Sequence, residues 1–125
     1  MAKNLVLENE AANAGCNAEC ALANSGYLRI KTAGGTLLAE LEFGATAFGS
    51  AVAGVATANA ITPESSAPAT GEAAKYEVYK SDGTTLCWTG TVGTSDANLV
   101  LNSVNIQIGA QVSVTSMTHT VPKSA

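Results

Sequence analysis

Charged side chains are scarce in this sequence. They make up 13% of its 125 residues, and ten acidic against six basic residues give a formal net charge of −4. An average soluble domain is about 25% charged. So few cations exclude the basic stripe that binds duplex nucleic acid and the polybasic cluster that binds an anionic membrane. We expect a neutral, hydroxyl-rich surface, or one partly covered by other subunits, because interface cores are depleted in charge.

Aromatic residues and long apolar runs are also scarce. Aromatics are 5% of the chain, so the core must consist mostly of Val, Leu, Ile and Ala, which bury less area than rings do. The apolar run from Leu5 to Leu7 is shorter than the ~7–15 residues of a secretory signal. No run reaches the ~18 residues of a membrane span. We therefore expect one domain that is made in a cytoplasm without processing.

The number of cysteines, three, is odd, which argues against a secreted disulfide framework. Cys16 and Cys20 would share one face of a helix, but without disulfide geometry. A zinc site of Cys16, Cys20, Cys87 and His119 is an alternative, although this spacing matches no tight metal knuckle. We expect reduced, partly buried thiols, no metal site and no cofactor.

Residues 10–24 predict one N-terminal helix. Ala14, Ala18 and Leu22 recur every four residues and form one stripe. The sequence Asn24-Ser25-Gly26 predicts the C-terminal cap, with Gly26 as the left-handed residue. Residues 1–25 are interpreted as an N-terminal arm and helix, and residues 26–125 as a β-sandwich domain.

The sequence after Gly26 alternates between apolar and polar residues, as short strands do. The expected strands are 27–33, 36–43, 54–60, 73–80, 84–93, 98–108 and 111–121. This pattern indicates a mainly β fold, an antiparallel β-sandwich of jelly-roll type with a short N-terminal helix.

Turn signals separate these strands. Gly34-Gly35 predicts a hairpin, and Asp82-Gly83 predicts a second one of type I′. Residues 61–72, with two prolines, predict an exposed loop.

The apolar positions of the strands predict the core. It should contain Leu28, Ile30, Leu41, Phe43, Tyr76, Val78, Trp88, Leu99, Leu101, Val112 and Val114, with Phe48 and Val52 anchoring the looser segment between the strands. On the outside of the first hairpin, Arg29 and Lys31 are expected to face Glu40 and Glu42.

Catalytic patterns are weak. His119 would have to serve any Ser-His-Asp triad, but the sequence has no G-x-S-x-G elbow. Glu40 and Glu42 resemble a carboxylate pair, but a solvated strand face explains them better. Asp82-Gly83 lacks the further carboxylates of a calcium loop. We expect no enzyme, and no catalytic or cofactor-binding residues.

From Gly26 to Pro122 the chain resembles a group of short phage and prophage proteins. The resemblance rests on the order of the segments GYLRI, TLLAELEFG, AFGSAVAGVATANAIT, ATGEA, YKSDGTTL, GTVGTS, LVLNS and GAQVSVTSMTHTVP. The sequence departs from the group at TAGG, where related chains tend to run longer. The resemblance implies a structural protein of the bacteriophage virion.

Capsid cement is the favoured role. Such a decoration protein would bind the outside of the assembled shell, contact the major capsid protein and stabilise the particle. It would be a homo-oligomer, with a trimer expected, and residues 1–9 or 61–72 would reach neighbouring subunits. One alternative is a phage tail or head-completion protein. The second is a carbohydrate-binding β domain, for which Tyr27 and Tyr79 offer few stacking rings.

Overall fold

The computed structural model describes residues 8–95 and 97–121. Within them lie one helix and ten short strands, so the mainly β class with a short N-terminal helix is confirmed. The elements are α1 (Asn9–Ala21), β1 (Tyr27–Lys31), β2 (Leu37–Phe43), β3 (Val55–Thr57), β4 (Ile61–Thr62), β5 (Gly71–Glu72), β6 (Lys75–Tyr79), β7 (Leu86–Gly93), β8 (Leu99–Val100), β9 (Asn105–Ile106) and β10 (Ser116–Thr120). Most of the predicted arm, residues 1–7, lies outside the described residues.

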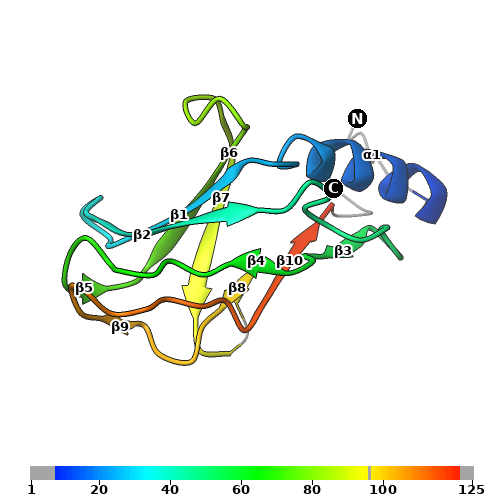
Figure 1. Cartoon of the computed structure of the whole chain (residues 1–125). Coiled ribbons are helices and arrows are strands. Elements are labelled where there is room, and N and C mark those ends of the chain that lie inside the picture. Colours follow the sequence, from blue (N-terminus) through cyan, green and yellow to red (C-terminus); the bar gives the residue numbers. More distant parts are fainter. Residues whose placement is uncertain (1–7, 96, 122–125) are drawn as a thin grey trace, which may run out of the picture.

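Eight strands form one curled sheet, a half-barrel, in the order β3-β10-β8-β7-β6-β1-β2-β4 (Figure 1). Its neighbours are antiparallel except β7 and β8, which are parallel. β5 and β9 form a separate two-stranded ladder. The expected jelly-roll sandwich is not confirmed, because most strands belong to this single mixed sheet.

Residues 55–64 join the two edges of the curled sheet. β3 pairs with β10, where Thr57 lies opposite Thr118, and β4 pairs with β2, where Ile61 lies opposite Phe43. Between these strands the Ala58 amide donates to the Met117 carbonyl at 2.9 Å. Since one passage of chain pairs on both sides, neither edge of the sheet is a long free template for another strand.

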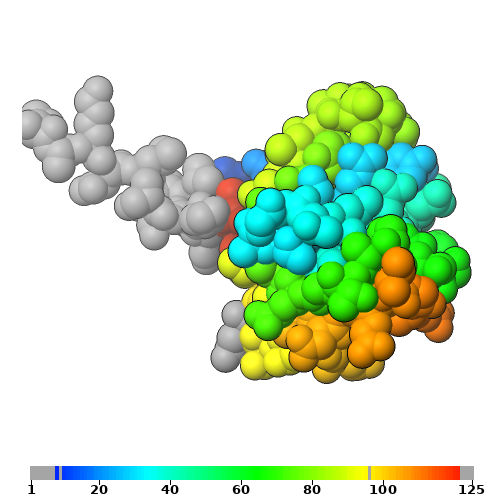
Figure 2. All heavy atoms as spheres, turned by 90° about the vertical axis from the view of Figure 1, so that its left-hand side faces the viewer, coloured from blue at the N-terminus to red at the C-terminus, as the bar shows by residue number. Residues whose placement is uncertain are grey.

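The predicted exposed loop 61–72 is wrong in part, because the segment runs beside residues 104–112 (Figure 2, green beside orange). The Ala67 amide donates to the Ala110 carbonyl at 2.8 Å, and the Gly109 amide donates to the Ala67 carbonyl at 2.8 Å. Ala67 is buried. Both prolines remain exposed. The prolines favour a loop, but the hydrogen bonds to a distant segment hold this stretch in a ladder.

The last two predicted strands are divided. Residues 98–108 form β8 in the curled sheet and β9 in the small ladder, and β10 covers only part of the predicted 111–121. The chain leaves the curled sheet after Val100 to pair with the 61–73 segment, where the Ala73 amide donates to the Val104 carbonyl at 2.8 Å.

The two predicted hairpins form, with corrections at their turns. At the second hairpin only Gly83 has a positive φ, 73°, so the turn is not type I′. The Asp82 carboxylate instead accepts hydrogen bonds from the Thr84 amide at 2.9 Å and the Thr85 amide at 2.8 Å. In the first hairpin, a register shift at Ile30/Lys31 breaks the expected alternation along β2.

The cap after α1 also differs from the prediction. Ser25, not Gly26, is the left-handed residue, with a φ of 57°. Gly26 is needed for another reason: a Cβ there would collide with the backbone oxygen of Tyr79. The glycine therefore lets the end of the helical segment pass close to the end of β6.

The predicted core is largely confirmed. Its buried members are Leu28, Ile30, Leu41, Phe43, Tyr76, Val78, Leu99, Leu101 and Val112, and Trp88 and Val114 are partly buried. The Phe48 ring centroid lies 5.8 Å from that of Phe43 and 6.0 Å from that of Trp88. Val52 is wrong as an anchor: it is 74% exposed, because it begins a tight turn whose next residues, Ala53 and Gly54, both have positive φ.

Asparagine side chains attach α1 and its C-terminal turn to the 44–54 loop. The Asn13 Oδ1 accepts from the Gly54 amide at 2.8 Å, the Asn17 Oδ1 from the Ala51 amide at 2.8 Å, and the Asn24 Oδ1 from the Ala47 amide at 2.9 Å. Backbone amides that are removed from water need such acceptors. The loop is therefore held by side chains where it lacks a regular strand partner.

Replacing Asn17 with Ala should lower the free energy of unfolding by about 1 kcal/mol. The Ala51 amide loses its acceptor, and the higher helix propensity of Ala offsets part of that cost. Asn17→Asp is the matched control, because it keeps an oxygen at this position. Urea denaturation measures both, and equal stability of the Ala variant and the natural protein would contradict the assigned role.

Two glycine substitutions should have opposite effects. A Cβ on Gly90 would lie 2.5 Å from the Tyr76 hydroxyl oxygen, so Gly90→Ala should destabilise the protein by about 1–3 kcal/mol. A Cβ on Gly15 of α1 would meet no atom within 4 Å, so Gly15→Ala should stabilise it by about 1 kcal/mol. Thermal melting checks the pair, and a Gly90→Ala variant as stable as the natural protein would show that the Tyr76 ring does not occupy the space above Gly90.

Candidate functional site

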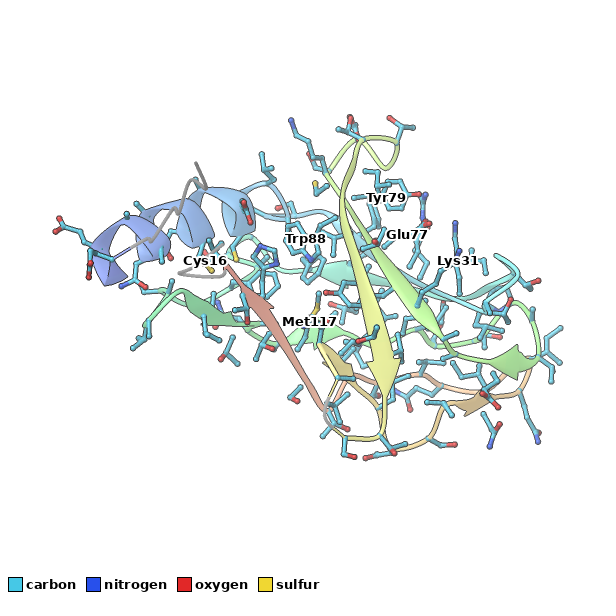
Figure 3. All side chains as sticks on the ribbon, turned by 180° about the vertical axis from the view of Figure 1, so that it is seen from behind. Cys16, Lys31, Glu77, Tyr79, Trp88 and Met117 are labelled. Atoms are coloured by element: carbon cyan, nitrogen blue, oxygen red, sulfur yellow. The ribbon has the colours of Figure 1, made fainter. Side chains whose placement is uncertain are left out.

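Two of the residues weighed for a zinc site, Cys16 and Cys20, lie on the buried side of α1; Figure 3 labels Cys16. The Cys16 and Cys20 sulfurs are 4.0 Å apart, and the Cys16 thiol donates to the His119 carbonyl at 3.4 Å. The His119 ring lies 4.2 Å from the Trp88 ring, between centroids, and its Nε2 is 2.6 Å from a Glu19 carboxylate oxygen.

Cys87 is not part of this cluster, because its thiol contacts the Thr85 carbonyl at 3.8 Å. Across residues 8–95 and 97–121, no three His, Cys, Asp or Glu side chains are arranged to hold a metal ion. His119 pairs with Glu19 rather than with a nucleophilic hydroxyl.

Burial keeps the Cys20 thiol protonated. Burial and the neighbouring Cys16 together raise the pKa of Cys20 to about 12. Burial also raises the pKa of Cys87. Since the thiolate is the nucleophile and the metal ligand, Cys20 behaves as a small apolar core residue at neutral pH.

Hollows open on the surface of the described residues. One of 340 Å³ is lined by Leu101, Asn102, Ser103, Asn105, Ile106, Gln107, Ala110, Gln111, Val112 and Ser113. The second, 190 Å³, lies between α1 and residues 46–50, and the third, 160 Å³, lies between residues 58–61 and 114–117. Their linings are amides, hydroxyls, aliphatic groups, one aromatic ring and one thiol, so they offer little for acid–base chemistry.

Charged side chains gather on the outer surface of β1, β2 and β6. Arg29 forms an ion pair with Glu40 at 2.7 Å, as predicted. The predicted contact of Lys31 with the glutamates of β2 is wrong, because Glu42 lies opposite Tyr27 at the other end of β1. Lys31 instead forms an ion pair with Glu77 of β6 at 2.7 Å. In Figure 3, Lys31, Glu77 and Tyr79 lie on one side of the sheet, away from α1.

The contacts of Glu77 and of Arg29 have separate consequences for stability and for ligand binding. Hydrogen bonds from Lys31 and Tyr79 lower the pKa of Glu77; the stability they contribute is present above the ordinary carboxyl pKa and is lost as the pH falls through the lowered value. The Arg29 guanidinium lies 4.3 Å from the Tyr79 ring centroid. That ring, one of the two considered for sugar stacking, therefore already has a partner.

On the outer surface of the sheet, charged side chains are present on β6 but not on the neighbouring strand β7. Lys75 and Glu77 of β6 lie opposite Thr91 and Thr89 of β7. From there to the far edge, the outward-facing residues are hydroxyl-bearing or aliphatic. We call them the neutral face: Val55, Thr57, Thr89, Thr91, Val100, Ser116, Thr118 and Thr120.

The helix α1 also presents an uncharged surface. The outward residues Ala11, Ala14, Ala18, Ala21 and Leu22 are exposed and Gly15 is half-buried; together they are called the α1 outer face.

The predicted stripe of Ala14, Ala18 and Leu22 lies on this outer side. Ala12, Cys16, Cys20 and Ala23 are the buried stripe instead. Asn13 and Asn17 flank it because they bond to the 44–54 loop, and this rotation turns the alanines outward.

Comparisons with known proteins give no relative: no family model, curated protein or solved structure matches this chain. Among the described residues, no helix has the length and apolar character needed to cross a membrane.

Thiol labelling should separate the cysteines. In the native protein at pH 8, the partly exposed Cys87 should react with an aromatic disulfide reagent, while Cys16 and Cys20 should react only after unfolding in guanidinium, because burial shields both sulfurs from the reagent. The Cys87→Ser variant is the control and should show no fast thiol. Rapid labelling of that variant in its native state would contradict the packing under α1.

Proposed function

We propose that this chain is a structural protein of a bacteriophage particle, a capsid cement or decoration protein. It binds the outside of the assembled shell, contacts the major capsid protein and stabilises the particle. The proposal builds on the ordered set of segments from Gly26 to Pro122 that resembles short phage and prophage proteins.

The α1 outer face is the observation that carries the proposal. A helix on the surface of a globular protein normally turns charged or polar residues to water. Here the middle of the water-facing side consists of alanines, a glycine and Leu22, which is 44% exposed, and the exposed residues Glu10, Asn17 and Glu19 lie along its borders. An apolar strip in the middle of the outer face, with the polar residues only at its borders, is unusual for a helix that faces water, and a shell surface would cover that strip.

The chemistry of the remaining surface supports a scaffold more than a catalyst. The hollows carry amides, hydroxyls and aliphatic groups, and the arginine–glutamate and lysine–glutamate pairs lie on the outside of the sheet. A tail or head-completion protein would use the same body at a different site of the particle. A carbohydrate-binding domain is less well supported, because Arg29 covers the ring of Tyr79.

A charge on the α1 outer face should block shell binding. Ala18→Arg keeps a good helix former but buries an unpaired cation in the contact, so its affinity for shells that lack this chain should fall at least about tenfold. Ala33→Arg, in the exposed turn between β1 and β2, is the matched control and should bind normally. Co-sedimentation with shells measures both, and moderate salt should not release the natural protein.

Particle reconstruction and a heat challenge decide between the phage roles. Cement predicts density over the whole shell and earlier rupture of shells that lack this chain. Density confined to the tail, or equal heat resistance without the chain, would refute the cement role and favour the tail or head-completion role.

A further inference from the structure

We infer that the turn at residues 51–55, called the apolar tip, is an anchor that inserts into an apolar pocket of the protein that covers α1. The inference rests on the proposed function, under which this partner is the major capsid protein of the shell. It adds a second contact beside the α1 outer face and names what the partner must accommodate, a branched aliphatic side chain.

The apolar tip departs from the usual chemistry of a tight turn. Ala53 and Gly54 both have positive φ, 52° and 79°, and around them Val52 and Val55 exchange two backbone hydrogen bonds of 2.9 Å. Turns in which both central residues have positive φ favour Asn-Gly or Asp-Gly, because the left-handed backbone is strained for alanine. Alanine therefore lowers the stability of this turn, and an asparagine would avoid most of that strain.

The tip also places apolar side chains in water. Val52 is 74% exposed and Val55 is 37% exposed. Ile108 is 68% exposed as well, but its turn follows the usual rule, because the residue with positive φ there is Gly109. Single exposed aliphatic residues are common, whereas at the apolar tip the exposure coincides with backbone strain. Strain of this kind persists where it serves function, and a contact with another protein would offset both costs.

Hydrogen bonds fix the backbone of the tip. The Gly54 amide donates to the Asn13 Oδ1 at 2.8 Å, and the Gly54 carbonyl accepts from the Val121 amide at 2.8 Å. The Ala51 amide donates to the Asn17 Oδ1 at 2.8 Å. A segment held in this way loses little conformational entropy when it binds, so the burial of its apolar side chains contributes almost fully to affinity.

The position of the tip favours the same partner as α1. The bond between Gly54 and Asn13 ties the tip to α1, and Figure 1 shows the turn before β3 beside α1 at one end of the molecule, with β9 at the other end. A projecting turn fits a concave site, and binding interfaces commonly seat an aliphatic or aromatic anchor in a pocket.

A lipid surface matches the tip less well than a protein pocket does. The tip carries no aromatic ring, and the described basic residues lie on β1, on β6 or in the turn after it. Segments that bind the membrane surface combine large apolar side chains with nearby lysine or arginine. The apolar tip has neither, so we assign it to a protein partner.

The thermal stability of an Ala53 variant tests the strain without shells. Ala53→Asn should raise the melting temperature by at least about 2 °C, because asparagine tolerates the left-handed backbone better than alanine does. Ala33→Asn, in the exposed turn between β1 and β2, is the matched control and should leave the melting temperature unchanged. An Ala53→Asn variant no more stable than the natural protein would overturn the inference, because the turn would then carry no strain for a partner to offset.

Co-sedimentation with shells that lack this chain tests the contact itself. Val52→Asp should weaken binding at least about tenfold, because a carboxylate would enter an apolar pocket, and Val52→Ala should weaken it about three- to tenfold. Both variants should melt like the natural protein, since the side chain of Val52 is mostly in water. Ile108→Asp changes a similarly exposed aliphatic residue near β9 and, as the matched control, should bind normally.

The variants separate this inference from the proposed function. Normal binding by Val52→Asp together with loss of binding by Ala18→Arg would overturn the anchor and leave the contact through α1 intact. A natural chain that binds no shells would overturn both. Sedimentation of the natural chain with vesicles of phosphatidylcholine and phosphatidylglycerol, abolished by Val52→Asp, would overturn the protein pocket and assign the tip to a membrane.

Discussion

The curled sheet depends on the pairing of residues 55–64 on both of their edges. β10 comes from the other end of the chain, and β2 precedes this passage by only a short loop. The entropy of closing the long loop to β10 must be met by backbone hydrogen bonds and by burial of residues such as Ala56 and Met117. With few aromatic rings to bury, the fold relies on this continuous backbone pairing more than on large side chains.

The local parts of the fold could be predicted from the sequence, and the long-range parts could not. The hairpins β1–β2 and β6–β7 follow from alternation and glycine turns, which are properties of neighbouring residues. The parallel pairing of β7 with β8 and the ladder between residues 61–73 and 104–112 join distant segments. No local pattern marks them, and the two prolines of the 61–72 segment point the other way.

The candidate surfaces were predictable in composition but not in position. Low charge indicated a neutral surface, but its location depends on β7 lying between β6 and β8, which only the sheet order reveals. In α1, the stripe through Ala14 and the stripe through Cys16 have the same period. The signals that separate them are the high burial of cysteine in general and the asparagines four residues apart that bond to the 44–54 loop.

The two uncharged surfaces differ in the charges at their borders. Glu10 and Glu19 border the α1 outer face, so two copies that met there would bring carboxylates together, whereas basic groups at the rim of another protein would be attracted. The described part of the neutral face carries no charge, so electrostatics there neither attracts nor repels a partner. The acidic border therefore gives the α1 outer face a preference for a different protein over its own copy, which is why the proposed shell contact is assigned to α1 and not to the sheet.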